Sequence, residues 1–115
     1  MNFTKLFFEA NKNRIIENND RALEFFEKCL EIKPNSSAVM YEISRIKSYQ
    51  GSNISALEFA KNAVEKTPDN KWYLLQLARI QKLMGQSQEA LTSFEKVVEL
   101  DPKNLAVLYE LGQQY

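Results

Sequence analysis

The sequence predicts an all-α protein made of stacked pairs of antiparallel helices. It is poor in helix-breaking residues, with 3 Gly and 3 Pro among 115 residues, and rich in Leu, Glu, Lys, Ala and Gln, which favour helix. The prolines, Pro34, Pro68 and Pro102, each lie 34 residues from the next. A fixed period between roughly 20 and 50 residues is typical of proteins built from stacked structural units.

Small and aromatic residues keep the same step as the prolines. Small residues recur at two places in each period, and short identical segments return one or two periods later. The recurring residues are Ala10, Ser44, Ala78 and Gly112; Ala22, Ala56 and Ala90; Gly51 and Gly85; Phe26-Glu27-Lys28 and Phe94-Glu95-Lys96; Arg45-Ile46 and Arg79-Ile80. This many agreements in one register favour a structural repeat over chance.

Each period is predicted to hold two helices, and residues 71–104 show the plan most clearly. The first helix has the i, i+3, i+4, i+7 spacing of one helical face, at Leu74, Leu77, Ala78 and Gln81. Gly85 ends this helix, because glycine accepts the left-handed conformation of a helix C-terminus, and Ser87 is the expected N-cap of the next. The second helix has an apolar side and ends before Pro102; that side holds Ala90, Leu91, Phe94, Val97 and Val98.

The two preceding units follow the same plan, residues 37–70 more closely than residues 3–36. Residues 37–70 reproduce it through Met40, Ile43, Ser44, Gly51, Ala56, Leu57, Ala60, Ala63, Val64 and Pro68. Asn70 and Asn104 stand at matching positions as N-caps of the helices that follow them. Residues 3–36 are less regular, because Glu9 replaces an apolar residue and Glu17 replaces the glycine at the first helix stop. Terminal units of repeat proteins are often atypical.

The small residues at two fixed places have a packing role. In each unit a small residue precedes an alanine by 12 positions, as Ser44 precedes Ala56. On facing helices such a pair lets the two backbones approach closely, while Phe26 and Phe94 fill the space between units. We therefore assign these positions to the core and not to chemistry.

A 34-residue unit with small residues at its eighth and twentieth places and proline at its thirty-second resembles the tetratricopeptide repeat. The resemblance covers a single array over residues 1–115, with units 3–36, 37–70 and 71–104 and a partial first helix over 105–115. It implies a right-handed α-solenoid in which first helices line a concave groove and second helices form the convex back. One departure is the eleventh place, usually a large aromatic residue, which here holds Asn13, Lys47 and Gln81; Ile46 and Ile80 beside it are expected to supply the apolar contact.

The resemblance singles out one stripe of each first helix as a candidate binding surface. This stripe takes the second, fifth, ninth and twelfth places of each unit, which lie on one helical face, and it is both aromatic and basic. The predicted groove residues are Phe7, Asn11, Arg14, Tyr41, Arg45, Trp72, Leu75, Arg79, Lys82 and Tyr109. Exposed aromatic residues mark interaction sites, and arginine binds carboxylates in a bidentate manner.

The predicted function is therefore a protein-interaction scaffold that binds an extended or helical protein segment with acidic and aromatic or apolar residues. The competing interpretation is that Tyr41, Trp72 and Tyr109 pack between units and that the arginines are merely solvated. Some family members hold a chaperone C-terminal carboxylate with Lys, Asn, Asn, Lys and Arg. Only one of the corresponding residues here agrees with that set, which argues against this mode; they are Phe7, Asn11, Glu42, Trp72 and Gln76.

A second possible role is structural. The partial helix 105–115 carries Leu105, Leu108 and Leu111 without a second helix to cover them. An uncovered end of a solenoid tends to associate, so this helix could make a homodimer or an oligomerisation module of a larger protein.

Other function classes are disfavoured by composition. The net charge is zero, whereas a nucleic-acid binder needs excess Lys and Arg. No apolar run approaches the roughly 20 residues that a membrane span requires. The sequence has no His and one Cys, Cys29, in an apolar stripe between Phe26 and Leu30, so a catalytic thiol lacks its usual base. We predict no enzyme, no cofactor, no metal site, no nucleic acid and no membrane insertion.

Overall fold

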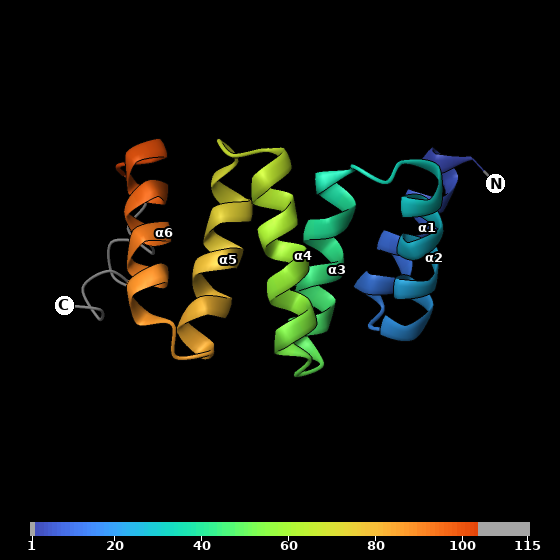
Figure 1. Ribbon diagram of the computed structural model, residues 1–115. Helices are drawn as coiled ribbons and strands as arrows, with labels where there is room; N and C mark the ends of the chain where they lie inside the picture. Colours follow the sequence, from blue (N-terminus) through green and yellow to red (C-terminus); the bar gives the residue numbers. More distant parts are fainter. Residues whose placement is uncertain (1, 104–115) are drawn as a thin grey trace.

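The computed structural model describes residues 2–103. Helices α1 (Phe3–Ile15), α2 (Asn19–Ile32), α3 (Ser37–Tyr49), α4 (Asn53–Lys66), α5 (Lys71–Leu83) and α6 (Ser87–Leu100) form three antiparallel hairpins. The hairpins lie side by side in chain order (Figure 1). No strand occurs between residues 2 and 103. The predicted all-α solenoid is thus confirmed, while the partial helix 105–115 and the expected cap Asn104 lie outside the described residues.

Polar caps fix where the first helix of each hairpin begins. The side chain of Asn2 accepts a hydrogen bond from Lys5 N, that of Ser36 from Val39 N, and that of Asn70 from both Trp72 N and Tyr73 N. These caps lie 34 residues apart and satisfy backbone donors that a helix start leaves unpaired. The predicted cap at Asn70 is confirmed.

The second helices begin without a side-chain cap. The prediction that Ser87 caps α6 is wrong, because Ser87 is already the first helical residue and Gln86 precedes it without a side-chain hydrogen bond. The backbone N–H of Gln86 instead donates to the Gln81 carbonyl oxygen at 2.9 Å. The chain therefore passes directly from the C-terminal turn of α5 into α6.

Residues in the left-handed conformation end the first helices. Gly51 has φ +80° and Gly85 has φ +76°, as the sequence predicted for helix stops. Glu17 occupies the equivalent position in the first hairpin and has φ +63°. A side chain in this conformation meets the steric penalty that glycine avoids, so the first turn carries strain that the other two do not.

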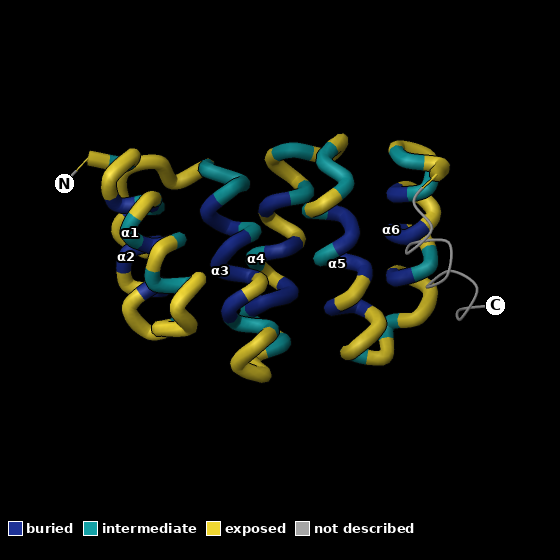
Figure 2. The backbone as a smooth tube through the Cα atoms, turned by 180° about the vertical axis from the view of Figure 1, so that it is seen from behind, coloured by how far each residue is buried: buried dark blue, intermediate teal, exposed yellow. Residues whose placement is uncertain are grey.

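Small residues form the tight centre of each hairpin. The predicted pairs Ala10 and Ala22, Ser44 and Ala56, and Ala78 and Ala90 are all fully buried. Phe26 and Phe94 are fully buried as well, as expected for residues that fill the core. Figure 2 shows the buried segments on the mutually facing sides of the helices, with the turns within the hairpins largely exposed.

The unusual eleventh place is accommodated in two ways. Ile46 and Ile80, next to it, are buried and supply the apolar contact that the sequence predicted. Gln81 is also buried, and its side-chain oxygen accepts a 2.8 Å hydrogen bond from the Ser93 hydroxyl of α6. Polar groups can replace an aromatic residue here because the buried pair satisfies itself.

The first place of each unit contacts its thirty-first place, with different chemistry each time. In the first hairpin Lys33 Nζ lies 4.4 Å from the ring centroid of Phe3. In the second, the hydroxyls of Ser37 and Thr67 share a 2.6 Å hydrogen bond. In the third, Lys71 Nζ lies 2.9 Å from Asp101 Oδ2. These three contacts join the two helices of each hairpin at the same end.

The outward face of α1 carries charged residues at three places that later hairpins use for stacking, beside the exposed Phe8. Lys5, Glu9 and Lys12 occupy places at which α3 buries Val39, Ile43 and Ile46 against the preceding hairpin. Charged side chains are costly to bury without partners. These three places therefore lack the apolar side chains on which the later hairpins stack.

Candidate functional site

The first helices α1, α3 and α5 place most of the predicted groove residues within reach of solvent. We call their exposed and half-buried set the first-helix face, which comprises Phe7, Asn11, Arg14, Tyr41, Arg45, Trp72, Arg79 and Lys82. Trp72 is 54% exposed, and the Arg45 side chain is 43% exposed. These side chains are therefore accessible to solvent. Tyr109 lies outside the described residues.

Leu75 does not contribute to this face. It was predicted to line the groove, but it is only 6% exposed and packs in a core cluster with Leu74 and Phe94. Removing an aliphatic side chain of this size from water is worth about 1.5–3 kcal/mol, which favours the buried position. The predicted groove therefore loses one of its residues on α5.

Phe7 is partly a core residue. Its ring stacks on Phe3 with centroids 5.8 Å apart and meets the edge of Phe26 at 6.0 Å. It is packed against the cluster that holds the first two hairpins together. Phe7 is consequently only half-exposed and offers less aromatic surface to the first-helix face than Trp72 does.

An aromatic cluster lies where α3 meets α5. The Tyr41 and Tyr73 rings are tilted at 40° with centroids 5.0 Å apart, a separation typical of attractive aromatic pairs. Arg45 lies 5.5 Å from the Tyr41 ring centroid, and Lys71 Nζ lies 5.1 Å from that of Trp72. Aromatic surface and cationic groups are therefore adjacent on one part of the first-helix face.

The cluster also sets the ionisation of Tyr41. Burial raises the pKa of the Tyr41 hydroxyl, while the positive charge of Arg45 partly opposes this shift. The hydroxyl stays protonated at neutral pH and can donate a hydrogen bond.

Sequence reasoning missed Tyr73 and Lys71. Both lie outside the four places of the predicted stripe, because Tyr73 is at the third place and Lys71 at the first place of their unit. The signal was a large aromatic residue at the place that holds the buried Val39 in α3. Its ring contacts Tyr41 of α3 in the preceding hairpin.

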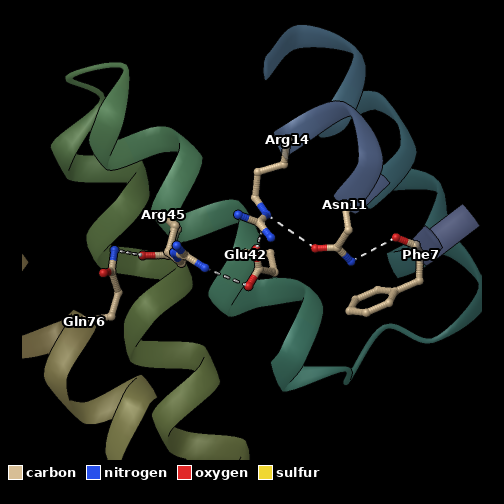
Figure 3. A network of polar contacts seen from close by, with 7 residues as sticks. Phe7, Asn11, Arg14, Glu42, Arg45 and Gln76 are labelled. Atoms are coloured by element: carbon tan, nitrogen blue, oxygen red, sulfur yellow. Dashed lines mark hydrogen bonds and ion pairs between the residues drawn. The ribbon is translucent and has the colours of Figure 1, made fainter. Parts of the chain in front are cut away.

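A polar network connects α1 to α3 across the boundary of the first two hairpins (Figure 3). Asn11 Nδ2 donates to the Phe7 carbonyl oxygen at 3.0 Å, and Arg14 Nε donates to Asn11 Oδ1 at 3.3 Å. Glu42 then joins two arginines, with Oε2 at 2.8 Å from Arg14 Nε and Oε1 at 3.3 Å from Arg45 Nη1. A single carboxylate thus positions both guanidinium groups.

The contact between Arg14 and Glu42 is an ion pair and not a directed hydrogen bond. Glu42 Oε2 is buried and accepts no hydrogen bond, although Arg14 Nε lies 2.8 Å away. The reason is that the Nε–H of Arg14 points at Asn11 Oδ1. The attraction is therefore mainly coulombic, and it is strengthened by the partial burial of both groups.

A neutral counterpart lies at the next boundary. Gln76 occupies in α5 the place that Glu42 occupies in α3, and its Nε2 donates to Ser44 Oγ at 3.3 Å (Figure 3). The two boundaries therefore use the same place for contact between hairpins, once with an ion pair and once with a hydrogen bond.

The residues at the chaperone-carboxylate positions are already engaged in this structure. Asn11 uses its amide within α1, and Glu42 puts a negative charge between Arg14 and Arg45. An incoming carboxylate at Glu42 would be repelled. That this chain does not hold a chaperone tail in that manner stays a prediction.

Within residues 2–103 the structure has no group of three or more His, Cys, Asp or Glu side chains gathered as a metal site. Cys29 is fully buried, as predicted, and burial raises the pKa of its thiol. A raised pKa disfavours the reactive thiolate. None of the six described helices has the length and apolar content needed to cross a bilayer.

Comparison with known proteins identifies the family. A tetratricopeptide repeat family model matches residues 14–36 and 73–104, which fall in the first and third hairpins. The first and third hairpins therefore match the tetratricopeptide repeat, the repeat of a family of protein-interaction scaffolds. No curated protein matches the chain by sequence.

Several solved structures share the fold. A crystal structure of MamA superposes with a TM-score of 0.91 at 19% identity, covering 98% of this chain and 62% of that one. The first tetratricopeptide domain of Spaghetti (RPAP3), bound to the HSP90 peptide SRMEEVD, gives 0.92 at 18% identity, covering 97% and 89%. The Sgt2 tetratricopeptide domain of Aspergillus fumigatus gives 0.87 at 20% identity, covering 97% and 76%. The chain thus spans less than two thirds of the MamA structure.

Proposed function

We propose that this protein binds a segment of another protein along the first-helix face, and that the segment carries acidic and aromatic or apolar residues. The observation that carries this function is the exposed Trp72 with Lys71 against its ring, on the same helix as Tyr73, whose partner Tyr41 has Arg45 against its ring. Aromatic residues and arginine are the side chains that most often dominate protein interfaces. The peptide-bound structure of a protein with the same fold supports a protein or peptide as the partner.

The scaffold suits a segment that is ordered on binding. Its first helices are held by capped ends, buried small residues and the Glu42 ion pairs. A preformed surface loses little conformational freedom on association. The free energy of binding then has to offset mainly the ordering of the segment itself.

The test is selection of peptides from a random display library on the intact chain. Trp72 is the only tryptophan, so its fluorescence reports contact with the first-helix face directly. We expect selected peptides to be rich in acidic and aromatic residues and to shift the Trp72 emission. Trp72→Ala and Arg45→Ala should each weaken binding roughly tenfold or more, as loss of an interface hot spot does.

A matched control is Ile54→Ala, which truncates a side chain of similar exposure on α4. It should leave the affinity unchanged. Peptides that bind equally well to the Trp72→Ala, Arg45→Ala and Ile54→Ala variants would contradict the proposed function. Failure of the library to yield any binder would do so as well.

Self-association through residues 105–115 is the alternative function. One arrangement, end-to-end stacking, needs a complementary surface at the α1 end, where Lys5, Glu9 and Lys12 replace the apolar residues of later hairpins. We therefore favour segment binding and expect a monomer at all concentrations in light scattering. A dimer that forms with rising concentration would favour the alternative instead.

A further inference from the structure

We propose that the turns within the second and third hairpins form a second protein-binding surface, which takes a partner segment whose contacting side chains are apolar and uncharged. We call this surface the turn edge and define it by Tyr49, Ile54 and Leu83. It is separate from the first-helix face and does not depend on the function proposed above. Figure 1 shows the turns within the hairpins along one edge of the array.

Large apolar side chains are exposed at this edge in every hairpin. The thirteenth place of each unit is the last residue of its first helix, and it holds Ile15, Tyr49 and Leu83. Their exposed fractions are 70%, 75% and 67%, and Ile54 at the start of α4 is 74% exposed. The core does not require these side chains. Their recurrence at one edge is the kind of exposed apolar surface that marks an interaction site.

The second and third turns carry no charged residue. Residues 48–57 and 83–88 contain no Asp, Glu, Lys or Arg, although these four types make up 26% of the chain. Charged residues return on both sides of each run, at Lys47 and Glu58 and at Lys82 and Glu89. An uncharged apolar centre with a polar rim is the usual anatomy of a protein interface.

A hollow of about 470 Å³ lies beside Ile54. Only one of its lining residues is charged; they are Gly51, Ser52, Asn53, Ile54, Ser55 and Glu58. Hydroxyl and amide side chains such as these can donate hydrogen bonds to a peptide backbone and accept them from it. The hollow therefore suits an apolar side chain of a partner together with the backbone that carries it.

The absence of charge defines the chemistry of the partner. A charged group brought onto the turn edge would lose water without gaining an opposite charge, whereas an apolar segment gains free energy by leaving water. An anionic membrane fits less well, because lipid-binding surfaces place Lys or Arg beside their apolar anchors. Residues 48–57 and 83–88 hold neither, and the two lysines that border them are matched by two glutamates.

A second copy of this chain also fits less well than a separate segment. Edge-to-edge pairing of two copies would cover the turn of the first hairpin, where Glu17 and Asp20 are exposed. A two-fold contact would thus remove both carboxylates of each copy from water. A short segment can lie on Tyr49, Ile54 and Leu83 alone, so we assign the turn edge to a different protein.

The turn edge and the first-helix face can be occupied at the same time. Trp72 and Leu83 lie near opposite ends of α5 (Lys71–Leu83), which separates them by about 16 Å along the helix axis. The chain would then bring two partners together, one with acidic and aromatic groups and one with an uncharged apolar segment.

The experiment selects peptides from a random display library on the full chain and discards those that also bind a variant with both Tyr49→Ser and Leu83→Ser. The affinity of each remaining peptide is measured by fluorescence anisotropy of a label on the peptide. We expect these peptides to be rich in aliphatic and aromatic residues and poor in charge. Tyr49→Ser, Ile54→Ser and Leu83→Ser should each weaken binding about tenfold, as loss of an interface hot spot does.

Two variants serve as matched controls. Phe8 is 66% exposed in the middle of α1, so Phe8→Ser removes a similar apolar side chain away from the turn edge. Trp72→Ala removes the main aromatic residue of the first-helix face. Neither should change the affinity. Every substituted residue is exposed, and circular dichroism checks that each variant keeps its helices.

Charge substitutions at Gln50 test the stated chemistry of the partner. Gln50 is exposed between Tyr49 and Gly51. Gln50→Glu and Gln50→Lys should both weaken binding, each about threefold, because either charge loses hydration in the contact. A partner held by its own charge would instead respond in opposite directions to the two variants.

Four results would overturn the proposal. The first is a library that yields no peptide specific for the turn edge, and the second is opposite responses to Gln50→Glu and Gln50→Lys. The third is binding to vesicles of phosphatidylcholine and phosphatidylserine that Tyr49→Ser abolishes, which would assign the edge to a membrane. The fourth is a dimer in light scattering that Tyr49→Ser abolishes, which would assign it to a second copy. The function of the first-helix face is tested separately, by the effect of Trp72→Ala on its own peptides.

Discussion

Ser44 and Ala56 face each other across the second hairpin, and the Ser44 hydroxyl donates a 2.9 Å hydrogen bond to the Ala56 carbonyl oxygen. Both residues are fully buried. The hydrogen bond satisfies the only polar group that the small-residue contact introduces. Small size and satisfied polarity together let α3 and α4 pack closely at this point.

Enlarging Ser44 should therefore cost more than removing its hydroxyl. Ser44→Ala loses the hydrogen bond to Ala56 and the one accepted from Gln76, at about 1 kcal/mol each. Ser44→Val loses the same two bonds and adds volume at a closed contact, which should cost about 1–3 kcal/mol more, so Ser44→Ala is its control. Urea denaturation followed by circular dichroism measures both, and a Ser44→Val variant as stable as Ser44→Ala would contradict the close contact.

Replacing Glu17 by glycine should stabilise the first hairpin. Glu17 has φ +63° where Gly51 and Gly85 occupy the same place, and relief of this conformation outweighs the added flexibility of glycine in the unfolded chain. We expect a gain of about 0.5–1 kcal/mol in thermal or urea denaturation. Gly85→Ala is the reciprocal control and should destabilise, although no heavy atom lies within 4 Å of the added Cβ; a stable Gly85→Ala variant would show that the conformation is not costly.

The buried pair Gln81 and Ser93 should behave as a unit. Gln81→Leu leaves the Ser93 hydroxyl without its acceptor and is expected to cost about 1–3 kcal/mol. Adding Ser93→Ala removes the unpaired hydroxyl, so the double variant should recover most of the loss. The free energies of unfolding of the four proteins in this cycle give the coupling, and additive losses would mean that the hydrogen bond contributes nothing.

Salt should weaken the Lys71–Asp101 contact of the third hairpin and leave the Ser37–Thr67 contact of the second hairpin unchanged. Lys71 and Asp101 form a partly exposed ion pair, which contributes at most about 1 kcal/mol and is screened by salt. Lys71→Gln is expected to destabilise at low ionic strength and to be neutral in about 1 M salt, where the Debye length is short. Ser37→Ala removes the hydrogen bond between the uncharged hydroxyls of Ser37 and Thr67. It should therefore lower the free energy of unfolding by the same amount at both ionic strengths.

Alkaline pH should destabilise the protein through Cys29 and Tyr41. Burial raises the pKa of both groups in the folded state, so the folded protein holds these protons more tightly than the unfolded chain. Their contribution to stability is complete below the ordinary pKa values and is lost as the pH rises through the raised ones. Urea midpoints between about pH 7 and about pH 10 should fall, and Cys29→Ala should make this decline shallower; an unchanged slope would contradict the assignment.

Much of the fold could be predicted because each signal acts locally. Gly51 and Gly85 end helices through their own backbone conformation, and Asn70 caps α5 through the next few residues. The spacing of Ala78 and Ala90 likewise defines one close contact within a hairpin. The period then copies these local rules along the chain.

The site could be predicted only in part because it depends on contacts between hairpins. Helical spacing placed Leu75 and Arg45 on one stripe, yet neighbouring core residues bury Leu75 and leave Arg45 exposed. The sequence placed Glu42 only among the residues that do not match the chaperone-carboxylate set, whereas its partners Arg14 and Arg45 lie on two different helices. Tyr73 was missed for the same reason, since its partner Tyr41 lies in the preceding hairpin.

The charged residues on the outer side of α1 limit how the array can be extended at its N-terminal end. A designed hairpin grafted ahead of residue 3 would meet Lys5, Glu9 and Lys12 instead of the valine and isoleucines that α3 presents to its neighbour. Exchanging those three side chains for Val, Ile and Ile would give α1 the apolar stacking residues of α3. Further hairpins could then be added ahead of residue 3.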